Sequence, residues 1–70
     1  MPETIIIYGK AGWPYTTKAR EAYKAHQYID VKQGPDKLRE LLKLTNGERR
    51  VPVIVENGDV QIGYGGSWGV

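Results

Sequence analysis

Cysteine is absent from this sequence of 70 residues. A chain without cysteine forms no disulfide and offers no thiolate to zinc or to an iron–sulfur cluster, so its stability must come from packing or from a partner. Long apolar runs are also absent: the isoleucine run at residues 5–7 falls far short of the about 20 residues of a membrane span. The start, Met1 to Glu3, lacks the charged-then-apolar pattern of a secretory signal. We therefore expect a cytoplasmic protein without membrane association, and a chain that performs no thiol chemistry as written.

The remaining composition is that of one small globular domain. With 40% hydrophobic and 26% charged residues, residues 1–70 are expected to form a single domain. The net charge of +2 is mild, and the basic residues are dispersed rather than grouped, so we expect no nucleic-acid partner. The one histidine, His26, has no second metal-type ligand nearby. We therefore predict no metal site and expect His26 to be a plain helix residue near the end of the first predicted helix.

The first half of the chain predicts a βαβ unit. The β-branched run Thr4 to Tyr8 has no polar alternation, which is typical of a central strand buried on both faces between parallel neighbours. Pro14 fits the first position of a helix, which places Trp13 at the N-cap and predicts a helix from Pro14 to about Ala25. The short strand Tyr28 to Val31 should then pair in parallel through a right-handed crossover.

The second half predicts a helix followed by a hairpin. The helix opens near Pro35, carries leucines at a spacing of three and four, and ends at Asn46, where Asn-Gly supplies a left-handed residue. Two strands, Val51–Val55 and Val60–Tyr64, flank a second Asn-Gly, which is a strong hairpin signal. The tail from Gly63 to Gly69 is too rich in glycine to continue a strand. The predicted order is βαβαββ, an α/β fold with a four-stranded mixed sheet and helices on its faces.

The loop from Lys10 to Trp13 lies where the predicted central strand ends and the first helix begins. Unsatisfied N–H groups and the helix dipole favour an anion at such a place. A thiol or selenol at position 13 would have a depressed pKa and stand as the reactive anion. Trp13 provides neither group, because an indole does not ionise usefully and cannot attack a disulfide.

Three segments of the chain resemble the glutaredoxin family, whose domains have the thioredoxin fold. Residues 10–16 resemble the stretch in which a reactive cysteine precedes Pro-Tyr, and residues 50–52 resemble the Thr-Val-Pro segment, whose proline is cis and faces the nucleophile. Residues 65–67 resemble the Gly-Gly turn that holds the γ-glutamyl end of glutathione. The segments follow the family order, and the resemblance covers nearly the whole chain. It implies a thioredoxin-like fold and a glutathione-linked thiol–disulfide oxidoreductase.

The resemblance implies a role for each matching position. Trp13 stands at the position of the nucleophile, Thr16 stands at the resolving position, and Pro52 is the expected cis proline. On general grounds Lys10 equally fits a solvated loop lysine, and Tyr15 equally fits a cover for the first helical turn. The glutathione contacts implied are Lys10 to a carboxylate, Tyr15 beside the tripeptide, Val51 through its backbone, Gly65, Gly66 and Ser67 around the γ-glutamyl carboxylate, and Arg49 or Arg50 as a second positive contact.

The sequence also departs from the family pattern. Trp13 removes the attacking group, Thr16 removes any resolving thiol, and Trp68 and Gly69 stand where glutaredoxins often have an acidic pair; the family's last helix is absent from this sequence. A small group of bacterial glutaredoxin-like selenoproteins carries selenocysteine before Pro-Tyr-Thr, and residues 12–17 are similar to that pattern. A tryptophan codon differs from the selenocysteine codon UGA by one base. Trp13 is therefore interpreted as a replaced or recoded selenocysteine, the alternative being a genuine contact residue.

Two functional hypotheses follow. The first is a glutathione-linked oxidoreductase of selenoprotein type, inactive as written, with glutathione as co-substrate, no other cofactor, and a disulfide-bearing small molecule or protein as partner. The second is a non-catalytic module that binds a peptide or protein through the aromatic side chains of Trp13, Tyr15, Tyr64 and Trp68. A nucleic-acid binder is the weakest hypothesis, because no face groups phosphate contacts.

Overall fold

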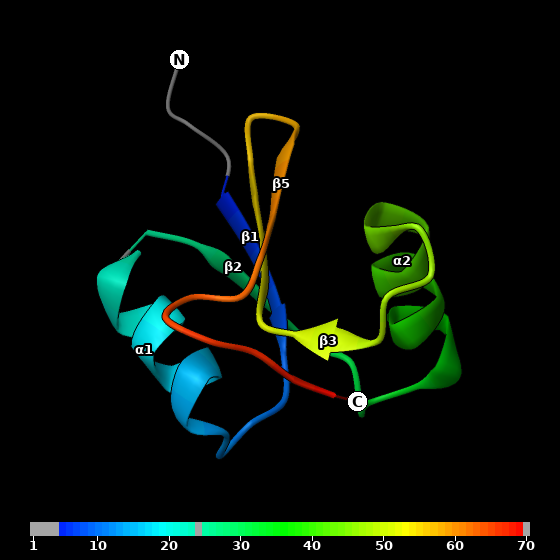
Figure 1. Ribbon diagram of the computed structural model, residues 1–70, viewed down its shortest axis with the longest axis horizontal. Coiled ribbons are helices and arrows are strands. Elements are labelled where there is room, and N and C mark those ends of the chain that lie inside the picture. Colours follow the sequence, from blue (N-terminus) through cyan, green and yellow to red (C-terminus); the bar gives the residue numbers. More distant parts are fainter. Residues whose placement is uncertain (1–4, 24, 70) are drawn as a thin grey trace.

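The computed structural model describes residues 5–23 and 25–69, so the predicted strand residue Thr4 and the predicted helix residue Lys24 lie outside the described part. The elements are β1 (Ile5–Gly9), α1 (Pro14–Ala22), β2 (Gln27–Asp30), α2 (Pro35–Thr45), β3 (Arg50–Val51), β4 (Val53–Glu56), β5 (Asp59–Ile62) and β6 (Trp68–Gly69). The main sheet has the order β2-β1-β4-β5. Helices α1 and α2 lie on opposite sides of this sheet (Figure 1). The predicted βαβαββ order and the four-stranded mixed sheet are confirmed, while β3 and β6 form a second, two-stranded sheet.

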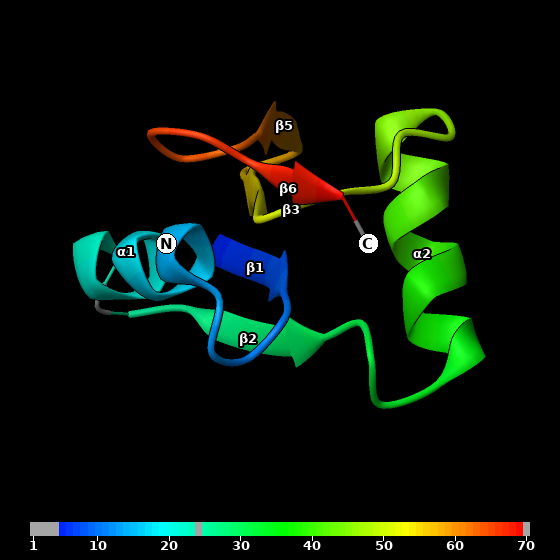
Figure 2. The same ribbon diagram turned by 60° about the horizontal axis from the view of Figure 1, so that its bottom comes forward.

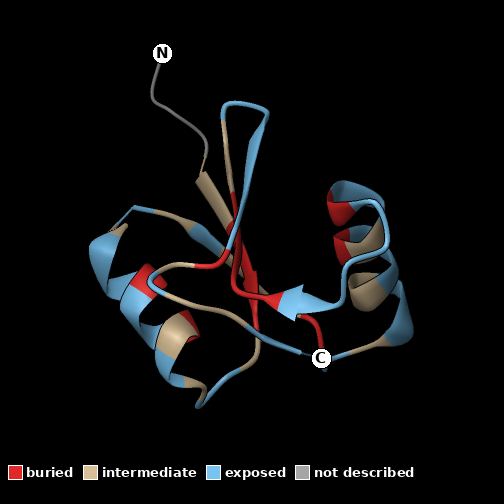
Figure 3. Cartoon of the chain, viewed as in Figure 1, coloured by how far each residue is buried: buried red, intermediate tan, exposed pale blue. Residues whose placement is uncertain are grey.

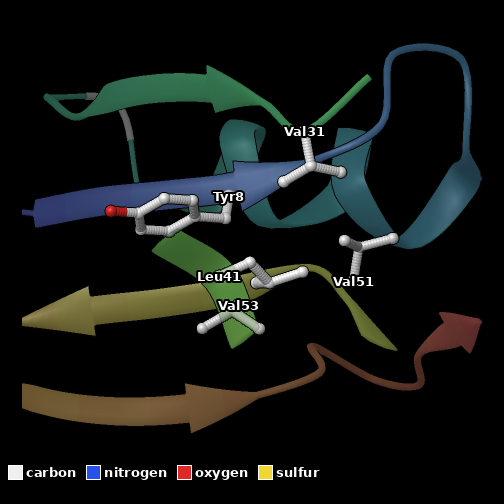
Figure 4. Close-up of a cluster of buried hydrophobic side chains, with 5 residues drawn as sticks. All are labelled: Tyr8, Val31, Leu41, Val51 and Val53. Carbon is white, nitrogen blue, oxygen red and sulfur yellow. The ribbon is translucent and has the colours of Figure 1, made fainter. Parts of the chain in front are cut away.

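Strand β1 is buried because its alternate residues pack toward different helices. Ile7 pairs with Ile54 of β4, and both belong to one core cluster with Ala19 of α1. A second cluster packs toward α2 and consists of Tyr8, Val31, Leu41, Val51 and Val53 (Figure 4). The buried residues therefore concentrate in the middle of the sheet (Figure 3). An apolar run without polar alternation results from this two-sided burial.

The predicted direction of the neighbours of β1 is only half correct. Strand β2 runs parallel to β1, with Ile6 opposite Gln27, whereas β4 runs antiparallel, with Ile5 opposite Glu56. Burial on both faces produces the same apolar run whichever way a neighbour runs. The pattern in the sequence therefore indicated burial correctly and did not determine strand direction.

Helix α1 ends at Ala22 rather than at the predicted position near Ala25. Tyr23 leaves the helical region with φ −108° and ψ 86°, and its ring packs against Tyr64 with the centroids 6.0 Å apart. The carbonyl oxygen of Tyr23 accepts a hydrogen bond from Nδ1 of His26. These contacts are made after the last helical turn, so the prediction that His26 is a helix residue was wrong.

Helix α2 and the β4–β5 hairpin follow their sequence signals closely. Asn46 caps α2 in the left-handed region at φ 61°, and Gly47 donates its N–H to the carbonyl oxygen of Leu42 at 2.9 Å. In the hairpin, Asn57 and Gly58 both have positive φ, as a two-residue turn of the primed type requires. Neither helix in the described part of the chain is long and apolar enough to cross a membrane.

The predicted strands 51–55 and 60–64 both have different bounds in the structure. The first breaks at Pro52 into β3 and β4, because proline has no N–H to donate to a ladder. The second begins earlier, at Asp59, and ends at Ile62, since Gly63 takes a φ of 91°. The glycine-rich tail, which was not expected to continue a strand, forms the short strand β6.

We expect Leu41→Ala to lower the free energy of unfolding by about 2–5 kcal/mol, because it removes buried contacts and leaves a cavity. Leu41 is 0% exposed, whereas Leu44 on the same helix is 37% exposed. Leu44→Ala is therefore the matched control and should cost less than about 1 kcal/mol. Urea unfolding followed by circular dichroism measures both values. Equal losses in the two variants would contradict the assigned core.

Candidate functional site

The structure brings the three motif segments together around position 13. Trp13 packs against the α2-side core cluster, of which Val51 is a member. Val51 is opposite Trp68 in the β3–β6 pair, and the rings of Trp13 and Trp68 have centroids 5.2 Å apart. The loop before α1, the strand before Pro52 and the C-terminal tail therefore form one site.

Position 13 is the N-cap of α1, as predicted from the proline that follows it. Trp13 has extended backbone angles, φ −87° and ψ 134°, and its side chain makes no capping hydrogen bond. Its carbonyl oxygen accepts from the N–H of Thr17 at 3.0 Å and from the Thr17 hydroxyl at 3.2 Å. The side chain at position 13 thus lies at the positive end of the helix dipole.

A close contact between Gly9 and Thr16 joins the end of β1 to the first turn of α1. Thr16 is 2% exposed, and its Oγ1 accepts a hydrogen bond from the backbone N–H of Lys10 at 3.4 Å. A Cβ at Gly9 would lie 2.5 Å from Cγ2 of Thr16, so only glycine allows this approach. The structure places the residue of the predicted resolving position inside this junction. Gly9 was not among the residues predicted for the site. Its place directly after a buried strand is the feature of the sequence that could have identified it.

Lys10 adds positive charge at the same position. Its Nζ lies 4.5 Å from the centroid of the Trp13 ring, which is within the range of a cation–π contact. An anion at position 13 would therefore be close to both the ammonium group and the helix N-terminus. The structure thus places Lys10 beside position 13 and leaves its predicted bond to a glutathione carboxylate as a prediction.

Trp13, Tyr15 and Trp68 form a cluster that we call the aromatic patch. Tyr15 meets Trp68 edge-on, with centroids 5.9 Å apart and an interplanar angle of 81°. Trp68 remains 46% exposed. Tyr64, which the binding-module hypothesis included, instead packs against Tyr23 beside the other core cluster.

The predicted Gly-Gly turn packs directly against the aromatic patch. A Cβ at Gly66 would lie 2.5 Å from Cζ of Tyr15, so the turn and the ring are in close contact. The carbonyl oxygen of Gly66 accepts from the N–H of Tyr64 at 2.9 Å, and Gly65 has a φ of 71°. Ser67 accepts a hydrogen bond at Oγ from Nη1 of Arg50 at 3.3 Å, which links the turn to β3.

Pro52, directly before β4, is the expected cis proline. The backbone of β3, which precedes it, is already paired with β6. The Val51–Pro52 peptide bond is cis, and the Pro52 carbonyl oxygen accepts from the N–H of Gly63 at 2.7 Å. Val51 is 1% exposed, and β3 pairs antiparallel with β6 (Figure 2). The backbone that the resemblance assigned to glutathione is therefore paired with the tail of the same chain.

His26 belongs to a separate pocket near the end of α1. Arg20 donates from Nε to Nε2 of His26 at 3.3 Å, so Nδ1 carries the proton that is donated to Tyr23. The pocket has a volume of about 300 Å³ and is lined by Thr17, Arg20, Glu21 and His26. No group of three or more His, Cys, Asp or Glu residues in the described ranges is placed to hold a metal ion.

Tyr28 lies next to this pocket. The Arg20 guanidinium stacks 3.9 Å from the centroid of the Tyr28 ring. Burial raises the pKa of the Tyr28 hydroxyl, the Asp30 carboxylate raises it further, and Arg20 partly offsets both effects. This hydroxyl has no hydrogen-bond partner, and it takes no part in the site at position 13.

The order β2-β1-β4-β5, with a helix that begins just after β1 and a cis proline just before β4, defines a thioredoxin-like fold. Two solved structures share it. A glutaredoxin from Archaeoglobus fulgidus superposes with a TM-score of 0.71 at 18% identity, over 86% of this chain and 74% of the other. A wheat glutaredoxin superposes with a TM-score of 0.68 at 20% identity, over 84% of this chain and 60% of the other.

The sequence model of the glutaredoxin family matches residues 5–61. The chain therefore belongs to the glutaredoxin family. No curated protein sequence matches it.

We expect Gly9→Ala to lower the free energy of unfolding by about 1–3 kcal/mol, because the new methyl group overpacks the junction with Thr16. Thr16→Ala removes Cγ2 and Oγ1, the two atoms nearest to a Cβ at Gly9, and leaves Cβ of residue 16 at 3.2 Å. In the Thr16→Ala background, the loss of unfolding free energy caused by Gly9→Ala should be smaller by about 0.5 kcal/mol or more. A double-mutant cycle measures this difference as the coupling energy of the two positions. Additive costs in urea unfolding would show that this contact does not constrain the junction.

Proposed function

We propose that this chain is a glutaredoxin-type, glutathione-linked thiol–disulfide oxidoreductase whose nucleophile at position 13 is replaced by tryptophan, so that the chain is inactive as written. Membership of the glutaredoxin family supports thiol–disulfide oxidoreductase-like chemistry. The observation that carries the proposal is the setting of Trp13, which is the N-cap of α1 and lies 4.5 Å from the Lys10 ammonium. This setting stabilises an anion, and an indole makes no use of it.

With a thiolate or selenolate at position 13, the reaction has two steps. The anion attacks one sulfur of a disulfide, forms a mixed disulfide with it, and releases the other sulfur as a thiolate. A second thiolate must then attack the substrate sulfur of this intermediate, which is a selenenyl sulfide where position 13 carries selenium. The second thiolate forms a new disulfide with that sulfur, and the bond to position 13 breaks to restore the anion. Thr16 has no thiol and is buried against Gly9, so this second thiolate comes from glutathione.

The proposed glutathione site lies between the loop, β3 and the Gly-Gly turn. Lys10 would attract a carboxylate of the tripeptide, and Tyr15 would pack beside it. Val51 would pair with the cysteinyl backbone, while Gly65, Gly66 and Ser67 would hold the γ-glutamyl carboxylate. The Arg50–Ser67 hydrogen bond supports this assignment, because it places a guanidinium group at the turn. A disulfide-bearing small molecule or protein in the cytoplasm is the proposed substrate.

Trp13 is proposed to stand for selenocysteine. The similarity of residues 12–17 to the selenocysteine-Pro-Tyr-Thr pattern supports this proposal, as does a site with a single nucleophile position and a threonine at position 16. The proposal requires a UGA codon and a selenocysteine insertion element in the native gene. An ordinary tryptophan codon without such an element would refute it.

We expect Trp13→Cys to create glutathione-dependent reduction of a low-molecular-weight disulfide such as hydroxyethyl disulfide, at least tenfold above the rate of the unchanged chain. The physical reason is that a thiol at the N-cap of α1 ionises near neutral pH. Trp13→Ser is the matched control, because it removes the indole and supplies no thiolate. Equal rates for the two variants would contradict the proposed function.

In the Trp13→Cys background, Lys10→Ala should raise the pKa of the new thiol toward the ordinary value of about 8.5, because it removes the neighbouring ammonium group. The rate of alkylation by iodoacetamide as a function of pH measures this pKa. Lys43→Ala removes an exposed lysine in the last turn of α2 and should leave the profile unchanged. A profile that Lys10→Ala does not move would remove Lys10 from the site.

The aromatic patch favours a second candidate function, a non-catalytic module that binds a peptide or protein. The Trp68 ring contacts both other rings of the patch and is 46% exposed, as is typical of an aromatic anchor in an interface. This function predicts that Trp13→Cys weakens binding of the partner and gains no reductase activity.

A further inference from the structure

The tail strand β6 takes the contacts that the proposed function assigns to glutathione. Trp68 is opposite Val51 in the β3–β6 pair, and its ring lies against Trp13 and Tyr15. The hydroxyl of the neighbouring Ser67 is bound by Arg50. We infer that β6 is an autoinhibitory strap, which occupies the proposed glutathione groove and must leave β3 before glutathione binds; this inference rests on the proposed function.

The pairing is small enough to be reversible. It comprises two residue pairs, Arg50 with Gly69 and Val51 with Trp68, whereas β1 pairs with β2 and with β4 over four residue pairs each. Both residues of β6 are exposed. Because β6 pairs with β3 alone and lies outside the four-stranded sheet, its release leaves that sheet intact.

The segment before β6 contains two adjacent glycines, which allow the backbone to bend. Gly65 and Gly66 both have positive φ, at 71° and 155°, and glycine takes other backbone angles at little steric cost. A Cβ at Gly65 would meet no atom within 4 Å, so the turn borders open space there, whereas Gly66 lies against the Tyr15 ring. Two adjacent glycines before a short strand are a suitable hinge for its release.

The ring at position 13 contributes to closure of the strap. Trp13 provides the ring that meets Trp68 at 5.2 Å, and a smaller nucleophile at this position loses the aromatic pair. Replacement of the nucleophile by tryptophan therefore both removes the reactive group and favours the closed form. When glutathione binds only the open form, its apparent Kd equals the intrinsic Kd of that form divided by the fraction of molecules that are open.

The test is a two-dimensional NMR titration with reduced glutathione of the unchanged chain and two variants that weaken the strap. Trp68→Ala removes the ring contacts, and Gly69→Pro removes a backbone N–H from β6. Both variants should bind about tenfold more tightly than the unchanged chain, the gain expected if about one molecule in ten is open. Shifts should appear at the amides of the groove residues Lys10, Tyr15, Val51, Gly65, Gly66 and Ser67. Release of the strap should add shifts at Arg50, Trp68 and Gly69, which form the β3–β6 pair.

The control is Val60→Ala, which truncates a side chain that is 40% exposed on β5 and should leave the affinity unchanged. Saturable binding that is equal or weaker in both strap variants overturns the strap and leaves the glutathione site standing. If none of the proteins shows saturable shifts with glutathione, the proposed function and the strap are both overturned. Retained amide shifts of the four-stranded sheet show that each variant is folded.

Discussion

The contact between Gly9 and Thr16 is the constraint on which the rest of the site depends. It holds the end of the buried strand β1 against the first turn of α1, so the loop between them has little freedom. The loop must then present residue 13 at the N-terminus of the helix, where the dipole and the Lys10 ammonium act together. A larger residue at position 9 would push the helix away from the strand and move position 13 with it.

The same junction explains why tryptophan is tolerated at position 13. The side chain leaves the N-cap toward Val51 and the tail, and it is half-buried rather than enclosed. The bulky ring therefore packs against the edge of the α2-side core cluster and against the exposed Trp68 ring. The site keeps the electrostatic setting of a nucleophile while its occupant makes packing contacts, and this combination gives the chain both an oxidoreductase framework and an exposed aromatic patch.

The two sheets differ in size and in their place in the core. The four-stranded sheet buries its clusters against α1 and α2, with Val51 of β3 in one cluster and Tyr64 of the tail packed against the other. The β3–β6 sheet lies beside it and contains the residue before the cis proline, the aromatic Trp68 and the link from Arg50 to Ser67. Strand β6 is short and exposed at both residues, whereas Val51 of β3 is 1% exposed and belongs to the core.

Local chemistry allowed the sequence alone to predict much of this protein. The isoleucine run indicated a strand buried on both faces, Pro14 indicated the start of α1, and Asn46 indicated the end of α2. Each signal depends on the conformational preferences of a few adjacent residues, so it can be read without knowledge of the rest of the chain. The family resemblance added the cis bond at Pro52, which the structure contains.

Only the tertiary structure decided the features that depend on residues far apart in the chain. The antiparallel direction of β4, the early end of α1 at Tyr23 and the pairing of Trp68 with Val51 all require partners from other elements. In the tail, Trp68 and Gly69 follow two glycines and a serine and have too little local preference to predict a strand. They form β6 because the edge of β3 offers backbone groups that pair with theirs and the rings of the aromatic patch pack against Trp68.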